Sequence, residues 1–233
     1  KDYLELLSGL LLELLPKSFG ENFNFLEKSA QKLLYVKGRV RLGTLDFWNE
    51  QEKVIWALAA EKGEKLALVQ HGGEYGITDY NVLTNQIEMN LDYFISWGWL
   101  DPKIKGTKIV PLPSPFHSKY IDKHRFDNNS LIMLGGGVRI LNSRVHWWTR
   151  SSTPAKYYSD AITFIDKLQE TPKNSIVFKP YNRWASEIDT VEFIKNRFPN
   201  IKLHEGDFNK SLLSCRLIVF YSFGTTMNFT MAA

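Results

Sequence analysis

The stretch "KLALVQHGGEYG", residues 65–76, decides the fold class of this chain. Residues 66–69 form a short apolar run, which is typical of a buried strand, and the strand is expected at 65–69. The run stops at Gln70 and His71 and continues into a loop whose glycines are Gly72, Gly73 and Gly76. A helical pattern with one apolar face occupies residues 49–62 just before it. A helix, a short buried strand and a glycine-rich loop in this order predict a parallel α/β sheet.

The same alternation continues along the chain. Further helices are expected at residues 4–15, 25–36, 81–92, 154–169, 186–197 and 209–214, and one more begins at 224. Further strands are expected at 93–97, 108–112, 130–134, 175–179, 201–204 and 217–221. Short strands separated by helices predict mostly parallel sheets with helices on both faces. A connector with three prolines at 111–115 divides the chain into two expected units, 1–115 and 116–233. The expected fold is α/β with two Rossmann-like units, the second truncated because the chain ends inside a helical pattern.

Composition narrows the class of protein. The 233 residues are 44% hydrophobic and 23% charged, as in a folded globular protein. A net charge of +4 and a pI of about 9.0 suit a phosphate-bearing ligand but lack the charge density of a dedicated nucleic-acid binder. The single cysteine, Cys215, excludes an internal disulfide. The leucine-rich segment 4–15 contains two glutamates and predicts an amphipathic helix rather than a signal peptide or a membrane span. We therefore expect a cytoplasmic protein.

Polar loops follow several of the expected strands. In open α/β sheets ligands bind at such strand ends, where helix N-termini offer free N–H groups. Cations, hydroxyls and free N–H groups suit a diphosphate, and a carboxylate suits ribose hydroxyls. Each loop also has an ordinary explanation as a turn, a helix cap or a solvated surface segment. The candidate ligand-binding residues are Gly135, Gly136, Lys179, Arg183, Glu205, Ser222, Thr225 and Thr226.

Four segments of the sequence carry a resemblance to a known family, and the first two are the most specific. "LVQHGGEYG" at 68–76 is followed by "DYFISWGW" at 92–99 and by "PLPSP" at 111–115. This combination resembles a family of transferases from O-antigen and surface-polysaccharide gene clusters, and "VFYSFGTTMNF" at 219–229 is similar to its donor-side segment. The family is similar in layout to two-domain glycosyltransferases of the GT-B type, and more distantly to capsule-polysaccharide transferases and glycerophosphotransferases. Relatives often carry a His-Pro or Pro-His pair where this chain has Lys179-Pro180-Tyr181.

The resemblance implies a glycosyltransferase that moves a sugar, or a related group, from a nucleotide sugar to a saccharide or lipid-linked saccharide acceptor. The first unit would bind the acceptor and the second the donor. His71, whose side-chain type has an unperturbed pKa of about 6.5, would take the proton of the acceptor hydroxyl, and Glu74 is a second candidate base. The alternative for His71 is a structural role within its loop.

The expected chemistry uses no cofactor and no metal, because the sequence contains no DxD motif. The expected partners are the donor and the acceptor, without nucleic acid, and a peripheral association with the inner membrane surface stays open. Two other functions stay open as well. One is a nucleotide-sugar epimerase of the same fold, and the other is a catalytically silent scaffold in polysaccharide assembly.

Overall fold

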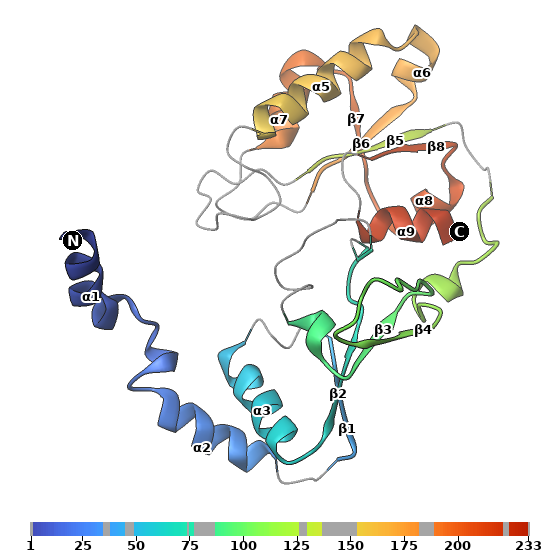
Figure 1. Cartoon of the computed structure of the whole chain (residues 1–233). Helices are drawn as coiled ribbons and strands as arrows, with labels where there is room; N and C mark the ends of the chain where they lie inside the picture. The colour runs from blue at the N-terminus through green and yellow to red at the C-terminus, as the bar shows by residue number, and fades with distance from the viewer. Residues whose placement is uncertain are drawn as a thin grey trace. The chain divides into compact units, whose positions relative to one another are not determined.

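The protein forms two compact α/β units, Lys1–Ser114 and Pro115–Ala233 (Figure 1). Each unit contains a four-stranded sheet whose strands are all parallel. The computed structural model describes residues 2–34, 38–44, 49–73, 75–76, 87–125, 130–136, 153–181, 189–220 and 224–232. The expectation of an α/β protein with two Rossmann-like units is confirmed.

Unit 1 is built on a sheet with the strand order β1-β2-β3-β4. Its strands are β1 (Val40–Gly43), β2 (Lys65–Val69), β3 (Tyr93–Ser96) and β4 (Lys108–Pro111). Its helices are α1 (Asp2–Leu14), α2 (Phe23–Leu33) and α3 (Glu50–Glu61), with single 3₁₀ turns at η1 (Lys17–Phe19) and η3 (Glu88–Asn90). Asn49 caps α3, because its side chain accepts a hydrogen bond from the Gln51 N–H at 2.8 Å.

The core of unit 1 lies on one face of this sheet. Leu68 and Phe94, neighbours on β2 and β3, are fully buried and pack against Trp56 of α3. Ile55 and Ala59 of α3 pack with Ala30 of α2 in a neighbouring cluster. On the other face the side chain of Leu42 remains 62% exposed. Among the described leucines of α1 the exposed fraction ranges from 37% to 68%.

Unit 2 has the strand order β7-β6-β5-β8. Its strands are β5 (Leu131–Leu134), β6 (Ile176–Lys179), β7 (Lys202–Leu203) and β8 (Leu217–Val219). Its helices are α5 (Thr153–Lys167), α6 (Glu170–Asn174), α7 (Thr190–Arg197), α8 (Phe208–Ser214) and α9 (Thr225–Ala232), with a 3₁₀ turn at η4 (His117–Lys119). Asp189 and Asp207 cap α7 and α8, since each carboxylate accepts two backbone N–H groups.

Both faces of the unit 2 sheet are covered by helices (Figure 1). Met133 and Phe178 point toward α5 and α7, where they pack with Ile165. Ile132, on the opposite face of β5, packs with Leu212 of α8 and with α9. The alternation of side chains along a strand thus sends successive residues of β5 into two different cores.

Several sequence-based predictions differ from the structure. The helix expected at 81–92 is replaced over its described part by the single turn η3, while 81–86 lie outside the described residues. The apolar strand expected at 217–221 forms as β8 over Leu217–Val219, at the edge of its sheet, and Leu217 is 53% exposed there. The sequence analysis also missed β1 and α6. β1 is only four residues long and carries Arg41, which pairs with the buried Glu64 at 3.2 Å.

Candidate functional site

The loop that follows β2 carries His71 at the carboxyl end of the unit 1 sheet. β2 is anchored by Leu68, which is fully buried, and the chain leaves the sheet at Gln70, whose N–H donates to the Ile95 carbonyl at 2.9 Å. Tyr75, in the same loop, packs on the ring of Phe94 with a centroid distance of 5.2 Å. A buried strand and a buried aromatic ring therefore fix both ends of the loop around His71.

Gln70 joins this loop to the segment that follows β3. Its Oε1 accepts hydrogen bonds from the Trp97 N–H at 2.9 Å and from the Trp99 Nε1–H at 2.8 Å. Its Nε2 donates to the Gly72 carbonyl at 2.6 Å. The residue is only 3% exposed, so these bonds replace water. The two segments that carry the sequence resemblance are thus tied to each other by one side chain.

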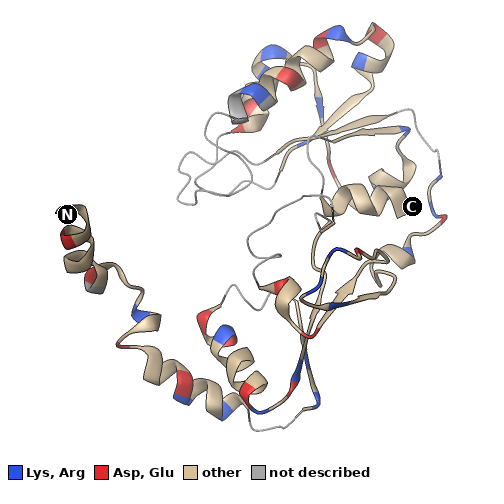
Figure 2. Cartoon of the chain, viewed as in Figure 1, with Lys and Arg blue, Asp and Glu red and all other residues tan. Residues whose placement is uncertain are grey.

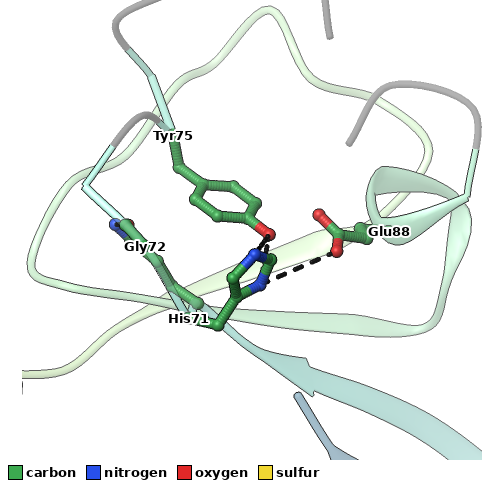
Figure 3. A network of polar contacts seen from close by, with 5 residues as sticks. His71, Gly72, Tyr75 and Glu88 are labelled. Carbon is green, nitrogen blue, oxygen red and sulfur yellow. Dashed lines mark hydrogen bonds and ion pairs between the residues drawn. The ribbon is translucent and has the colours of Figure 1, made fainter. Parts of the chain in front are cut away.

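His71 contacts two largely buried side chains, the Tyr75 hydroxyl and the Glu88 carboxyl group (Figure 3). The Tyr75 hydroxyl lies 2.7 Å from Nδ1 and 3.5 Å from Nε2 of the imidazole. Oε1 of Glu88 lies 3.9 Å from Nδ1, and the Glu88 side chain is 4% exposed, whereas the His71 side chain is 27% exposed. The ring therefore faces buried groups on one side and keeps part of its surface open.

Burial lowers the pKa of His71 below its ordinary value of 6.5. The imidazole is accordingly neutral at pH 7, which is the form that accepts a proton. Tyr75, Glu88 and Gln70 were not identified from the sequence. Tyr75 stands in the quoted loop, four residues after His71, but Glu88 falls in a polar segment that carries no periodic signal.

The loop glycines have different explanations. Gly76 has a φ of +77°, a conformation that favours glycine, whereas a Cβ there would make only an ordinary contact with the Trp99 ring at 3.5 Å. Gly72 provides the carbonyl that Gln70 bonds, and Gly73 is buried. The second candidate base, Glu74, lies outside the described residues.

In unit 2 the described candidate residues follow neighbouring parallel strands and so lie at the carboxyl ends of the strands, on the same side of the sheet. Lys179 ends β6, Glu205 follows β7 and Gly135 follows β5. The Lys179 ammonium donates to the Pro180 carbonyl at 2.9 Å and lies 5.6 Å from the centre of the Phe208 ring. Glu205 is exposed. This side of the sheet therefore offers a cation and a carboxylate on adjacent strands.

The glycines after β5 have packing roles. A Cβ on Gly135 would come within 2.7 Å of the Phe178 ring, so only glycine fits. The Gly136 carbonyl accepts a hydrogen bond from the Tyr158 hydroxyl at 2.6 Å. These contacts account for both residues without a ligand and leave phosphate contact as a prediction.

His204 was not singled out from the sequence, although it precedes Glu205. Its Nε2 lies 2.9 Å from the Ser211 hydroxyl, and burial together with the nearby Lys179 charge lowers its pKa. The burial of His204 and the positive charge of Lys179 therefore both disfavour the protonated form of His204.

Thr225 and Thr226 begin α9, the helix that follows the edge strand β8. α9 contains no charged residue (Figure 2). The buried imidazole of His117 is hydrogen-bonded to the backbone of Thr225, while burial as the larger effect lowers its pKa. η4 thus contacts the first turn of α9, and no local sequence pattern predicts this contact between distant segments. Arg183 and Ser222 lie outside the described residues.

Within the described ranges, His, Cys, Asp and Glu side chains form no group of three or more suited to a metal ion. Nor does any helix in the described part of the chain have the length and apolar character needed to cross a membrane.

Comparison with known proteins assigns the family. No curated protein and no solved structure matches the chain. A family model described as LIC12162 family transferase matches residues 1–233. Because this match covers the whole sequence, the chain belongs to the LIC12162 family of transferases.

Proposed function

We propose that this transferase moves a sugar, or a related group, from a nucleotide-activated donor to a saccharide or lipid-linked saccharide acceptor of a surface polysaccharide such as O-antigen. The observation that carries the proposal is the strand order β7-β6-β5-β8 of unit 2. Successive strands are added on one side of β5 until β7, and β8 is then added on the other side. Nucleotides bind at such a reversal in open α/β sheets, outside the carboxyl ends of the strands.

The residues around this reversal fit a nucleoside diphosphate. The N-terminus of α9, with Thr225 and Thr226, offers N–H groups and hydroxyls to phosphate oxygens. Lys179 supplies a positive charge, and the exposed Glu205 suits ribose hydroxyls. Arg183 and Ser222 complete the proposed donor site. The leaving-group charge is then stabilised by cations and the helix N-terminus, without a metal ion or other cofactor.

His71 is the proposed general base in unit 1. Its loop is held by Gln70 and Tyr75, its ring is partly exposed, and its lowered pKa favours the neutral form. Glu74 remains the second candidate. The sequence resemblance supports a GT-B type enzyme in which unit 1 binds the acceptor. Such an enzyme would work in the cytoplasm, with or without peripheral contact to the membrane.

Ligand binding separates this function from a scaffold. We expect a uridine, guanosine, cytidine or thymidine diphosphate to raise the melting temperature of the folded protein, because a ligand at 100 times its Kd stabilises by about 2.7 kcal/mol. Lys179→Ala should remove most of this stabilisation, whereas Lys156→Ala, in an exposed pair on α5, should keep it. A folded protein that responds to none of these nucleotides favours the scaffold.

Turnover tests the role of His71. We expect His71→Ala to lower kcat about 10²- to 10⁴-fold, because a positioned base is removed, while the nucleotide Kd and the melting temperature stay nearly unchanged. The measurement is transfer to the acceptor, with nucleotide binding followed by calorimetry. Wild-type turnover in folded His71→Ala excludes this residue as the base. Conversion of the donor sugar into its epimer without an acceptor would indicate the epimerase instead.

A further inference from the structure

Glu88 is a nearly buried carboxyl group directly behind the proposed base. Its side chain is 4% exposed, and its Oε1 lies 3.9 Å from Nδ1 of His71. The turn η3 carries Glu88, and Met89 beside it joins the same core as Leu68 and Phe94, so the carboxyl group is held by the core of unit 1. A buried carboxylate is costly unless a positive or hydrogen-bonding group compensates it.

The hydrogen bond between Tyr75 and His71 can form with either tautomer of the imidazole, with the donor and acceptor roles exchanged. The hydroxyl lies 2.7 Å from Nδ1, which is a short hydrogen bond, and 3.5 Å from Nε2. In one tautomer Tyr75 donates to Nδ1 and the ring proton is on Nε2. In the other, Nδ1–H donates to the Tyr75 oxygen and Nε2 is free to accept a proton. A carboxylate on the Nδ1 side favours the second tautomer, because it attracts the N–H dipole.

We propose that Glu88 is a positioning residue that keeps the proton of neutral His71 on Nδ1 and stabilises the imidazolium formed when Nε2 takes a proton. The reaction to which this applies is the transfer proposed above, so the catalytic part rests on that function. The O–H bond of the acceptor breaks and its proton goes to Nε2. The oxygen forms a bond to the donor carbon, and the nucleoside diphosphate leaves with the electron pair of the broken bond.

Two opposing influences act on His71. Burial disfavours the imidazolium and lowers the pKa of His71, whereas the Glu88 carboxylate acts in the opposite direction. At 3.9 Å the contact between Glu88 Oε1 and Nδ1 is longer than a hydrogen bond, and burial keeps the imidazole neutral in the free protein. Among the described residues, the titratable groups with recorded contacts to the imidazole are Tyr75 and Glu88. Removing the carboxylate should therefore lower the pKa of His71 further.

Nitrogen NMR of protein labelled at its five histidines tests the tautomer without any substrate. The His71 signals are assigned by their loss in His71→Asn. We expect the wild-type ring to carry its proton on Nδ1. In Glu88→Gln we expect a larger fraction protonated on Nε2 and a lower pKa of His71. Glu64→Gln is the control, since Glu64 is a buried carboxyl group of the same unit that pairs with Arg41 instead.

The wild-type spectrum alone can overturn the proposal, even if Glu88→Gln does not fold. A neutral His71 protonated mainly on Nε2 contradicts it, as does a folded Glu88→Gln protein with the wild-type tautomer and pKa. With an active wild-type enzyme, Glu88→Gln should lower kcat about 10- to 1,000-fold and move the acidic limb of kcat/KM to lower pH. An unchanged rate overturns the role of Glu88 in the reaction. A wild-type enzyme that transfers nothing contradicts the proposed function, while the spectra still decide the tautomer.

Discussion

Gln70 links the His71 loop to the segment that follows β3. It is 3% exposed and makes three hydrogen bonds, to the Trp97 N–H, the Trp99 Nε1–H and the Gly72 carbonyl. A glutamate would keep the acceptor but lose the donor to Gly72, and it would bring a charge into a buried position. The side chain at position 70 must therefore be an amide, because it both donates to the Gly72 carbonyl and accepts from the two tryptophan N–H groups.

Replacing Gln70 by alanine should destabilise the protein. Two donors and one acceptor would lose their buried partner, which we expect to lower the free energy of unfolding by roughly 2–4 kcal/mol. Urea unfolding followed by tryptophan fluorescence measures this change. Gln31→Ala is the matched control, because Gln31 is exposed and its amide bonds Glu27 on the same helix, so its loss should cost less than about 0.5 kcal/mol. Equal effects of the two substitutions would contradict this account of Gln70.

Sequence patterns locate His71 well but not its partners. An apolar run that ends in polar residues and glycines is visible in any reading of residues 65–76. The contact between His71 and Glu88 arises only when the chain between β2 and β3 returns to the sheet, so no local pattern encodes it. The ring of Phe178 likewise explains Gly135 only after β5 and β6 are paired.

Among the secondary-structure elements, β2 and β3 are linked at their amino ends by Asp92. Its Oδ2 accepts from the Leu66 N–H at 2.9 Å, and its Oδ1 accepts from the Lys65 ammonium at 2.7 Å. These hydrogen bonds, that from Leu66 first, lower the pKa of Asp92 below 3.8. The carboxylate therefore helps to set the parallel register that places the His71 loop next to the Trp97–Trp99 segment.

The stabilisation by Asp92 should depend on pH. A carboxyl group whose pKa is lowered by folding stabilises the protein fully above its unfolded value, and this stabilisation is lost as the pH falls through the lower folded pKa. We expect Asp92→Asn to cost about 1 kcal/mol at pH 7, with the difference from wild type shrinking below pH 3.8. Urea unfolding at pH 7, 5 and 3 tests this. A difference that stays constant over this range would mean that the charge of Asp92 contributes nothing.

Elements with strong periodicity were predictable, and short ones were not. β2 and α3 agree with the sequence analysis to within one residue at each end. β1 was not predicted because it is only four residues long and Arg41 interrupts its apolar pattern. The charge of Arg41 is balanced by the Glu64 carboxylate at 3.2 Å. The edge position of β8 depends on which strands pair, which a pattern of apolar residues along one strand does not contain.

At the scale of the whole molecule, each unit has its own buried hydrophobic clusters. Phe94 belongs to the cluster that contains Leu68 and Trp56 in unit 1, Phe178 belongs to the cluster that contains Met133 and Ile165 in unit 2, and both are fully buried. Each aromatic ring also supports one candidate site. Phe94 packs against Tyr75 in the His71 loop, and Phe178 fills the space beside Gly135 at the proposed donor site.

Phe94→Ala should therefore destabilise unit 1 more than unit 2, and Phe178→Ala should destabilise unit 2 more than unit 1. Each substitution should lower stability by about 3–5 kcal/mol, because it leaves a cavity in a packed core. We expect Phe178→Ala to increase hydrogen exchange in β5, β6 and α5 and to weaken nucleotide binding, with little change in β2 and β3. Phe94→Ala should increase exchange in β2, β3 and the His71 loop while nucleotide affinity stays near that of the wild type. Hydrogen exchange with mass spectrometry and calorimetric nucleotide titration measure both responses. Loss of protection to the same extent in both units, for both substitutions, would show that the two cores unfold as one cooperative structure.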